Sequence, residues 1–144
     1  MILTAVIDRL KAGVPATFAA VEGAEELEAL AAGTAPRHGT VFVLPFDGRG
    51  RPSNSTSGTH MQQVEMQFLT AVVIRRHDDA RGARRVAAAD EFMAALEEAL
   101  AGWSPLPDAP SPINYVAERA APAGNGILWL VVTWTTNRYI RKHV

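Results

Sequence analysis

Residues 61–74 give the strongest secondary-structure signal in the chain. Side chains on one side of this segment are apolar in strict alternation, which predicts a β-strand. They are Val64, Met66, Phe68, Val72 and Ile74. The other side is first polar and then apolar, with Gln63, Glu65 and Gln67 followed by Leu69, Ala71 and Val73. At about 3.3 Å per residue the strand would be about 46 Å long, which exceeds most strands in small domains. We therefore expect its first half to project beyond the core and its second half to be buried on both faces.

Helical spacing of apolar residues predicts two or three helices. The first opens the chain and ends before Gly13 and Pro15. Its apolar residues are Ile2, Leu3, Val6, Ile7 and Leu10. The longest helix is predicted over 86–100, with Gly102 after it as a stop signal. A third is predicted over 24–32, because its first turns are rich in glutamate, which suits a helix N-terminus.

Other apolar runs predict the remaining strands. Residues 41–44 form a compact run that Pro45 is expected to stop, and residues 18–21 allow one further short strand. Residues 113–120 and 127–138 predict a C-terminal β-hairpin around residues 122–126, because Asn-Gly favours a tight turn. We expect an α+β fold with a mixed or antiparallel sheet of about four strands, covered by two to three helices.

Between the predicted strands lies a long polar loop, DGRGRPSNSTSG at residues 47–58. It contains nothing that can build a core. Long loops inside compact domains are uncommon and often functional. This loop is therefore the first candidate for an interaction surface.

A second candidate surface is basic. Five of the arginines lie within residues 75–85: Arg75, Arg76, Arg81, Arg84 and Arg85. Such a patch could meet phosphate or an acidic partner. Asp78, Asp79 and Asp90 lie nearby as counter-charges, and this favours a solvated strand end and helix start.

Length and composition limit the class of protein. With 144 residues, residues 1–144 are expected to form one domain. The formal net charge is -1, so no overall field would draw the chain to nucleic acid or to a membrane. The chain has no cysteine, which excludes disulfides and thiolate chemistry. Asp8 and Arg9 interrupt the N-terminal apolar pattern, unlike a signal peptide, so we expect folding in a cytoplasm.

Residues that could carry chemistry do not form a recognisable site. The four histidines lack the paired spacing of metal ligands, and no Gly-x-Ser-x-Gly motif is present. His77 with Asp78 and Asp79 could be drawn as a proton-transfer site, but a charged turn is the favoured interpretation. The tryptophans Trp103, Trp129 and Trp134 are expected to pack in the core or the hairpin. We expect no catalytic residue, no cofactor and no metal.

Five segments carry packing and turn features that belong together. They are VEGA at 21–24, VFVLP at 41–45, QQV at 62–64, LAGWSP at 100–105 and GILW at 126–129. In this order they resemble the tail terminator proteins of long-tailed bacteriophages and related prophages, and the resemblance covers nearly the whole chain. The resemblance implies a structural virion protein that caps the head-proximal end of the tail tube, ends tube growth and presents a surface for head-tail joining.

The resemblance also implies partners. These are other copies of the chain in a ring expected to be hexameric, the tail tube protein and the head-tail connector protein. DNA would only pass through the ring as cargo, and no membrane is involved. The residues expected at protein interfaces are Asp47, Arg49, Arg51, Asn54, Gln63, Glu65, Gln67, Arg75, Arg76 and Arg138. Deleting residues 54–57 should weaken assembly and leave the monomer folded.

Two other functions remain open at this stage. One is a different neck or head-completion protein, because small α+β folds do not determine function. The other is a small ligand-binding or enzymatic domain, with a pocket near His77, Asp78 and Arg75. Thermal stabilisation by a metabolite would favour the ligand-binding alternative.

Overall fold

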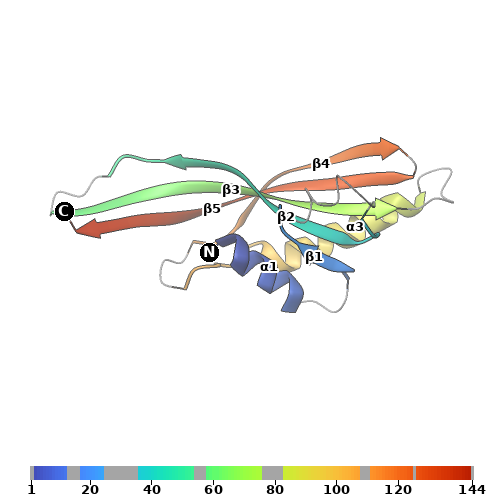
Figure 1. Cartoon of the computed structure of the whole chain (residues 1–144), viewed down its shortest axis with the longest axis horizontal. Coiled ribbons are helices and arrows are strands. Elements are labelled where there is room, and N and C mark those ends of the chain that lie inside the picture. Colours follow the sequence, from blue (N-terminus) through green and yellow to red (C-terminus); the bar gives the residue numbers. More distant parts are fainter. Residues whose placement is uncertain are drawn as a thin grey trace.

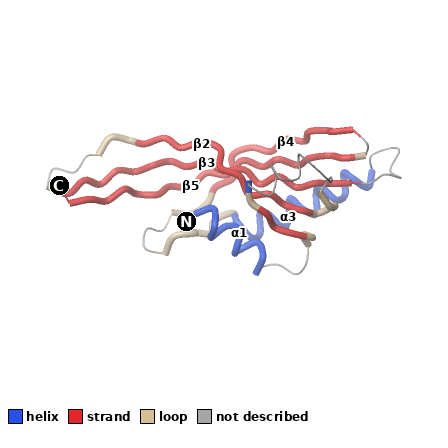
Figure 2. Tube along the Cα trace, in the orientation of Figure 1, coloured by secondary structure: helices blue, strands red, loops and turns tan. Residues whose placement is uncertain are grey.

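The structure is a computed structural model that describes residues 2–12, 17–24, 36–53, 58–75, 83–107, 111–124 and 126–143. These residues contain two helices, α1 (Ile2–Ala12) and α3 (Ala83–Leu100). They also contain β1 (Ala20–Glu22), β2 (Thr40–Gly50), β3 (Thr59–Arg75), β4 (Asn114–Gly124) and β5 (Ile127–His143). The five strands form one twisted sheet in the order β1-β2-β3-β5-β4 (Figures 1 and 2).

The sheet is mixed, because β1 runs parallel to β2 while the other neighbouring strands are antiparallel. This confirms the predicted α+β class and the C-terminal hairpin of β4 and β5. The sheet has five strands rather than about four, and β1 is the short strand that the sequence allowed. The helices within the described residues are two rather than two to three. The helix predicted over 24–32 lies, from residue 25 on, outside the described residues.

Strands β3 and β5 form the longest ladder, which runs from Thr59 opposite His143 to Arg75 opposite Ile127. Each strand has 17 residues, so the ladder is about 56 Å long at about 3.3 Å per residue. The two helices lie under one half of this ladder, and the other half extends past them (Figure 1). The first half of β3 therefore projects beyond the core, as its pattern predicted.

The main core lies between the helices and one face of the sheet. Phe68, Val72 and Ile74 of β3 are fully buried there in one cluster with Leu96 and Leu100 of α3. These three residues confirm the alternation predicted for the strand. A second, smaller cluster on the opposite face contains Phe42, Ala71 and Val73. The second half of β3 is therefore buried on both faces, as expected.

The tryptophans pack against this core, as predicted. Trp134 is fully buried, and its indole Nε1 donates a hydrogen bond of 2.9 Å to Thr70 Oγ1. The guanidinium of Arg9 lies 5.0 Å from the ring centroid of Trp103. Trp129 lies beside Phe42 with ring centroids 5.9 Å apart. These contacts connect α1, the segment after α3 and both faces of the sheet.

The prediction that Pro45 ends a strand was wrong. Strand β2 continues through Pro45 to Gly50, so residues 47–50 are paired strand and not loop. Strand β1 pairs with β2 only from Thr40 to Phe42, which leaves β2 as an edge strand at Pro45. An edge strand tolerates a residue without a backbone N–H donor. The pairing partners shift between Pro45 and Asp47, which marks a β-bulge at Phe46.

The hairpin turn is also shorter than predicted. Strand β4 continues through Pro122 to Gly124, which pairs with Ile127. Two residues therefore connect the strands, and Gly126 has a φ of 73°. This left-handed conformation explains the glycine in the Asn-Gly turn. Asn125 itself lies outside the described residues.

Candidate protein interface

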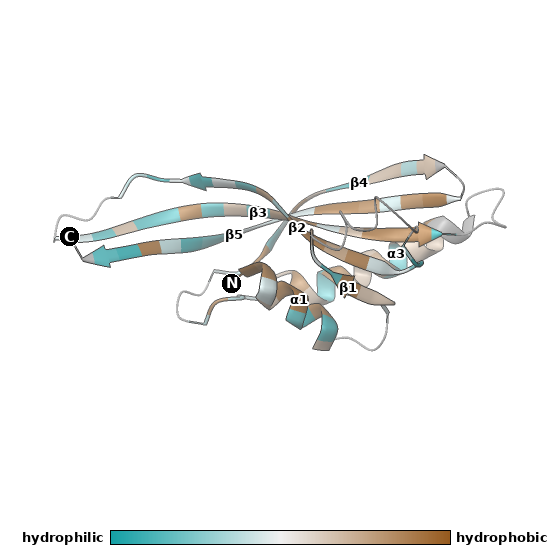
Figure 3. Cartoon of the chain, viewed as in Figure 1, coloured by the Kyte–Doolittle hydropathy of each residue, from teal (hydrophilic) through white to brown (hydrophobic). Residues whose placement is uncertain are grey.

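The part of the sheet that extends past the helices is the candidate interface, and we call it the arm. It comprises residues 47–50 of β2, 59–67 of β3 and 135–143 of β5. Figure 3 shows that the arm is more hydrophilic than the half of the sheet that carries the helices. All six residues of β2 from Pro45 to Gly50 are exposed. The arm therefore presents strand surface to its surroundings rather than to the core.

One face of the arm brings together residues from two strands that the sequence singled out. Asp47 pairs with Gln67, and Arg49 pairs with Glu65. These four side chains line a shallow hollow of about 330 Å³. Paired residues of neighbouring strands share a face. The bulge after Pro45 decides this arrangement, because it moves the odd positions of β2 from the helix side to the polar side.

The charged groups of this face are paired but exposed. Arg49 Nε lies 3.2 Å from Asp47 Oδ2, with 82% and 44% of the two side chains exposed. Arg51 Nη2 lies 3.8 Å from Glu65 Oε2, with 67% and 42% exposed. Exposed ion pairs of this kind contribute about 0–1 kcal/mol to stability. Because these pairs are weak, their side chains could exchange them for ion pairs with a partner protein at little cost in stability.

The base of the arm is attached to the rest of the chain by Asn137. Its side-chain amide Oδ1 accepts a hydrogen bond of 3.0 Å from Gln63 Nε2 on β3. Its Nδ2 and its backbone N–H each donate to Ser111 Oγ at 3.2 Å. Thr136 Oγ1 donates to the backbone oxygen of Ser111 at 2.9 Å. These bonds connect the segment before β4 to the point where the arm begins.

The tip of β5 carries unbalanced positive charge. Arg138, Arg141 and Lys142 are exposed, and within the described residues no carboxylate forms an ion pair with them. Arg138 pairs with Val64 and therefore lies on the face opposite the hollow. Arg141 lies 5.8 Å from the ring centroid of Tyr139. In this part of the chain no further strand is paired with the outer edge of β5 beyond Thr135.

The candidate interface consists of exposed polar and charged side chains on paired strands. Within the described ranges, no group of three or more His, Cys, Asp or Glu residues could hold a metal ion. The pKa of Tyr115 is raised above 10.0 by partial burial, and the hydrogen bond to Glu118 and the charges of Glu118 and Glu97 add to the shift. No helix in the described part of the chain combines the length and apolarity needed to span a bilayer.

Comparison with known proteins identifies the family. The family model described as phage tail terminator protein matches residues 1–143. The chain belongs to this family. A tail terminator family member has a structural role in a phage tail, and this confirms the resemblance found in the sequence.

The fold has a similar counterpart among solved structures. A chain of the structure titled "Virion of native gene transfer agent (GTA) particle" matches with a TM-score of 0.61 and 13% sequence identity. The match covers 94% of the tail terminator chain and 92% of that chain. At this identity the likeness concerns the fold. No curated protein sequence matches the chain.

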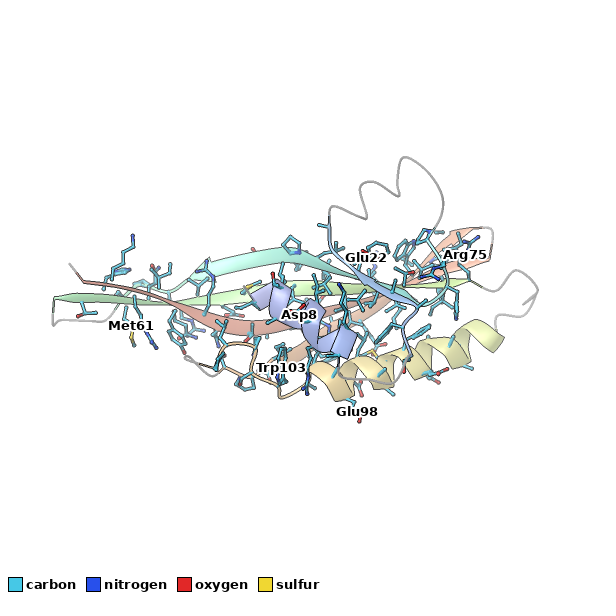
Figure 4. The ribbon with its side chains drawn as sticks, turned by 60° about the horizontal axis from the view of Figure 1, so that its bottom comes forward. Asp8, Glu22, Met61, Arg75, Glu98 and Trp103 are labelled. Atoms are coloured by element: carbon cyan, nitrogen blue, oxygen red, sulfur yellow. The ribbon has the colours of Figure 1, made fainter. Side chains whose placement is uncertain are left out.

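The structure brings most of the predicted interface residues of this family member to the arm. They are Asp47, Arg49, Gln63, Glu65, Gln67 and Arg138. Arg51 directly follows β2, and its backbone N–H donates to the backbone oxygen of Gln63 in the arm at 2.8 Å. Arg75 lies at the opposite end of β3 from Met61, an arm residue (Figure 4). There its Nη1 donates to the backbone oxygen of Pro36 at 3.1 Å. Asn54, Arg76, the deletion 54–57 and the trio at 77–79 lie outside the described residues.

Sequence reasoning missed three residues of the arm. Asn137, Tyr139 and Arg141 belong to β5, which was expected to end at Arg138 but continues to His143. The available signal was the pair Tyr139 and Ile140, since aromatic and β-branched residues favour strands. The role of Asn137 has no local signal, because its partners lie 74 and 26 residues away in the chain.

Proposed function

We propose that this tail terminator family member forms a ring, expected to be hexameric, that caps the head-proximal end of the tail tube. The ring ends tube polymerisation and presents the surface to which the head connector binds. Its partners are other copies of the chain, the tail tube protein and the connector protein. The protein acts as a structural part of the virion and not as an enzyme, it is assembled in the host cytoplasm, and DNA passes through the ring as cargo.

The arm is the observation that carries this proposal. A monomer gains little from a ribbon of three strands that extends past its own helices, because that ribbon leaves polar strand surface without cover. A closed ring needs heterologous contacts, in which one surface meets a different surface of the next copy. An arm at one end of the sheet and helices at the other provide two such surfaces.

The decisive test is electron microscopy of particles made without this protein. We expect overlong tails that lack heads, and supplying the protein in trans should restore tails of uniform length. Normal tails joined to heads would contradict the proposal. Tails of normal length with separate heads would instead favour another neck or head-completion role.

A matched pair of variants connects this test to the arm. Arg49→Glu reverses an exposed charge on the polar face, and Arg37→Glu reverses an exposed charge outside the arm. We expect Arg49→Glu to restore fewer uniform tails than Arg37→Glu when both are present at equal amounts. Equal restoration would contradict a contact through this face.

A further inference from the structure

The exposed side of α3 carries a continuous acidic stripe. From residue 90 to residue 101, just past the end of the helix, the exposed residues repeat at helical spacing as two pairs of acids, each followed by an alanine. They are Asp90, Glu91, Ala94, Glu97, Glu98 and Ala101. Figure 4 shows Glu98 on the side of α3 that is turned away from the sheet. Within the described residues, no basic side chain forms an ion pair with the four acids.

The stripe continues toward the edge strand β4. Tyr115 Oη lies 3.1 Å from Glu118 Oε1, and the negative charge of Glu97 also acts on this phenol. Tyr115 and Val116 are large and 45% and 42% exposed. In the described chain no strand pairs with the outer side of β4. The acidic side of α3 and this partly apolar edge of β4 therefore lie next to each other, and Ala101 at the end of the stripe is bridged to Ile113 just before β4.

The opposite charge lies on β5 in the arm. Arg138, Arg141 and Lys142 are exposed and form no ion pair with a described carboxylate. The formal charge of the chain is only -1. Exposed basic and acidic surfaces on different elements of one chain favour association between unlike surfaces of two copies.

We infer that the basic tip of β5 in one copy binds the acidic face of α3 in the next copy. This inference rests on the proposed ring and names the surfaces that join its subunits. Contact between unlike surfaces is the heterologous kind that rotation can close into a ring. Arg138 and Lys142, which share one face of β5, meet Glu97 and Glu98, and this contact sets the direction in which copies follow one another.

The same contact is impossible within one copy. Ala101, three residues after Glu98, is bridged to Ile113, and the next residue, Asn114, pairs with Thr135 of β5. Lys142 lies seven residues further along this strand, which is about 23 Å at about 3.3 Å per residue. The ladder with β3 holds the strand extended over this length. A covalent bond between Lys142 and Glu97 or Glu98 must therefore join two copies.

Zero-length carbodiimide crosslinking tests the contact directly, because it joins amines to carboxylates that already touch. Lys11 and Lys142 are the only lysines, so few products are possible. The experiment uses tails assembled from a mixture of isotopically heavy and light protein. We expect peptides in which Lys142 is bonded to Glu97 or Glu98, with mixed heavy and light halves. Lys142 bonded only to the tube protein or to no protein would overturn the inference.

Charge reversal provides a second, independent test of the contact. Glu97→Arg with Glu98→Arg should lower the yield of ring at least about tenfold, since close interfacial charge pairs contribute more than about 1.4 kcal/mol. Adding Arg138→Glu and Lys142→Glu, two substitutions on one face of β5, to the same chain should restore the yield. Asp8→Arg reverses an exposed acid on α1 and should change nothing. Failure of the combined variant to recover, with each variant folded by circular dichroism, would contradict the contact.

The outcomes separate this inference from the proposed function. If the Glu97 and Glu98 variant still forms rings and ends tails at normal length, only the inference fails. If particles without the protein have normal tails joined to heads, the proposed function fails, because a ring of this protein is then not needed to end the tube or to join the head. If the β5 tip instead binds DNA, Lys142 should be protected from chemical modification in DNA-filled particles and unprotected in empty ones. That result would also refute the contact between copies.

Discussion

The hydrogen bond between Trp134 and Thr70 predicts that Thr70→Val will destabilise the protein more than its size change suggests. Valine has nearly the shape of threonine, so the substitution leaves no cavity. It removes the acceptor of a 2.9 Å bond, and both residues are 0% exposed, so the indole N–H stays buried without this partner. An unsatisfied buried donor costs about 1–3 kcal/mol. At about 4 °C per kcal/mol for a chain of this size, Tm should fall by about 4–12 °C.

Urea denaturation followed by circular dichroism measures the free energy of unfolding of each variant. Thr70→Ser keeps the hydroxyl and loses one methyl group, so it should cost about 1 kcal/mol. Trp134→Phe removes the donor, so adding Thr70→Val to it should cost less than Thr70→Val alone. Strictly additive losses, or a Thr70→Val variant as stable as the parent, would refute the reasoning.

Three further substitutions test other parts of the structure. Asn137→Leu removes the side-chain bonds to Gln63 and Ser111, so hydrogen exchange in the arm should accelerate, whereas Tyr139→Phe should leave it unchanged. Arg9→Ala removes a bond to Ala99 O and the contact with Trp103, and should lower the free energy of unfolding by about 1–2 kcal/mol in urea. Gly126→Val, at a φ of 73°, should lower Tm, and Gly126→Asn should lower it less.

The register of β3 and β5 explains why the buried bond matters for the arm. A slip of one residue would exchange the two faces of a strand. Gln63, Glu65 and Gln67 would then turn to the other side of the arm, and the hollow beside Asp47 and Arg49 would lose two of its lining residues. The fully buried Thr70 and Trp134 oppose this slip, because their bond forms in only one register.

Strand β3 shows how much of the fold local pattern can predict. Its alternation and its change from one buried face to two were readable from residues 61–74, and the structure confirms them, although the strand runs from Thr59 to Arg75 and is longer than predicted. Strand β2 shows the limit. Pro45 and the glycines after it are turn signals, yet pairing with β3 holds residues 47–50 in a strand. Tertiary pairing overrode local preference at this edge.

The candidate interface likewise contains residues that the sequence pattern predicted and residues that only the structure placed there. The polar face of β3 was predicted because its side chains alternate within one segment. The position of Asp47 and Arg49 on that same face was not, because it depends on a bulge. Asn137 was missed because its partners, Gln63 and Ser111, are distant in the chain.

By itself the sequence determined the two-faced strand, the N-terminal and long helices, the C-terminal hairpin, the lack of cysteine and the resemblance to tail terminators. The helices and strands among these follow from the spacing of residues along the chain, because that spacing determines on which side of a helix or strand each side chain lies. Only the tertiary structure decided that β5 runs on to form the arm with β2 and β3, and that the basic residues of β5 lie in this arm while the acidic side of α3 lies outside it. Such features depend on which strands pair across long stretches of chain, and residue spacing does not encode that choice locally.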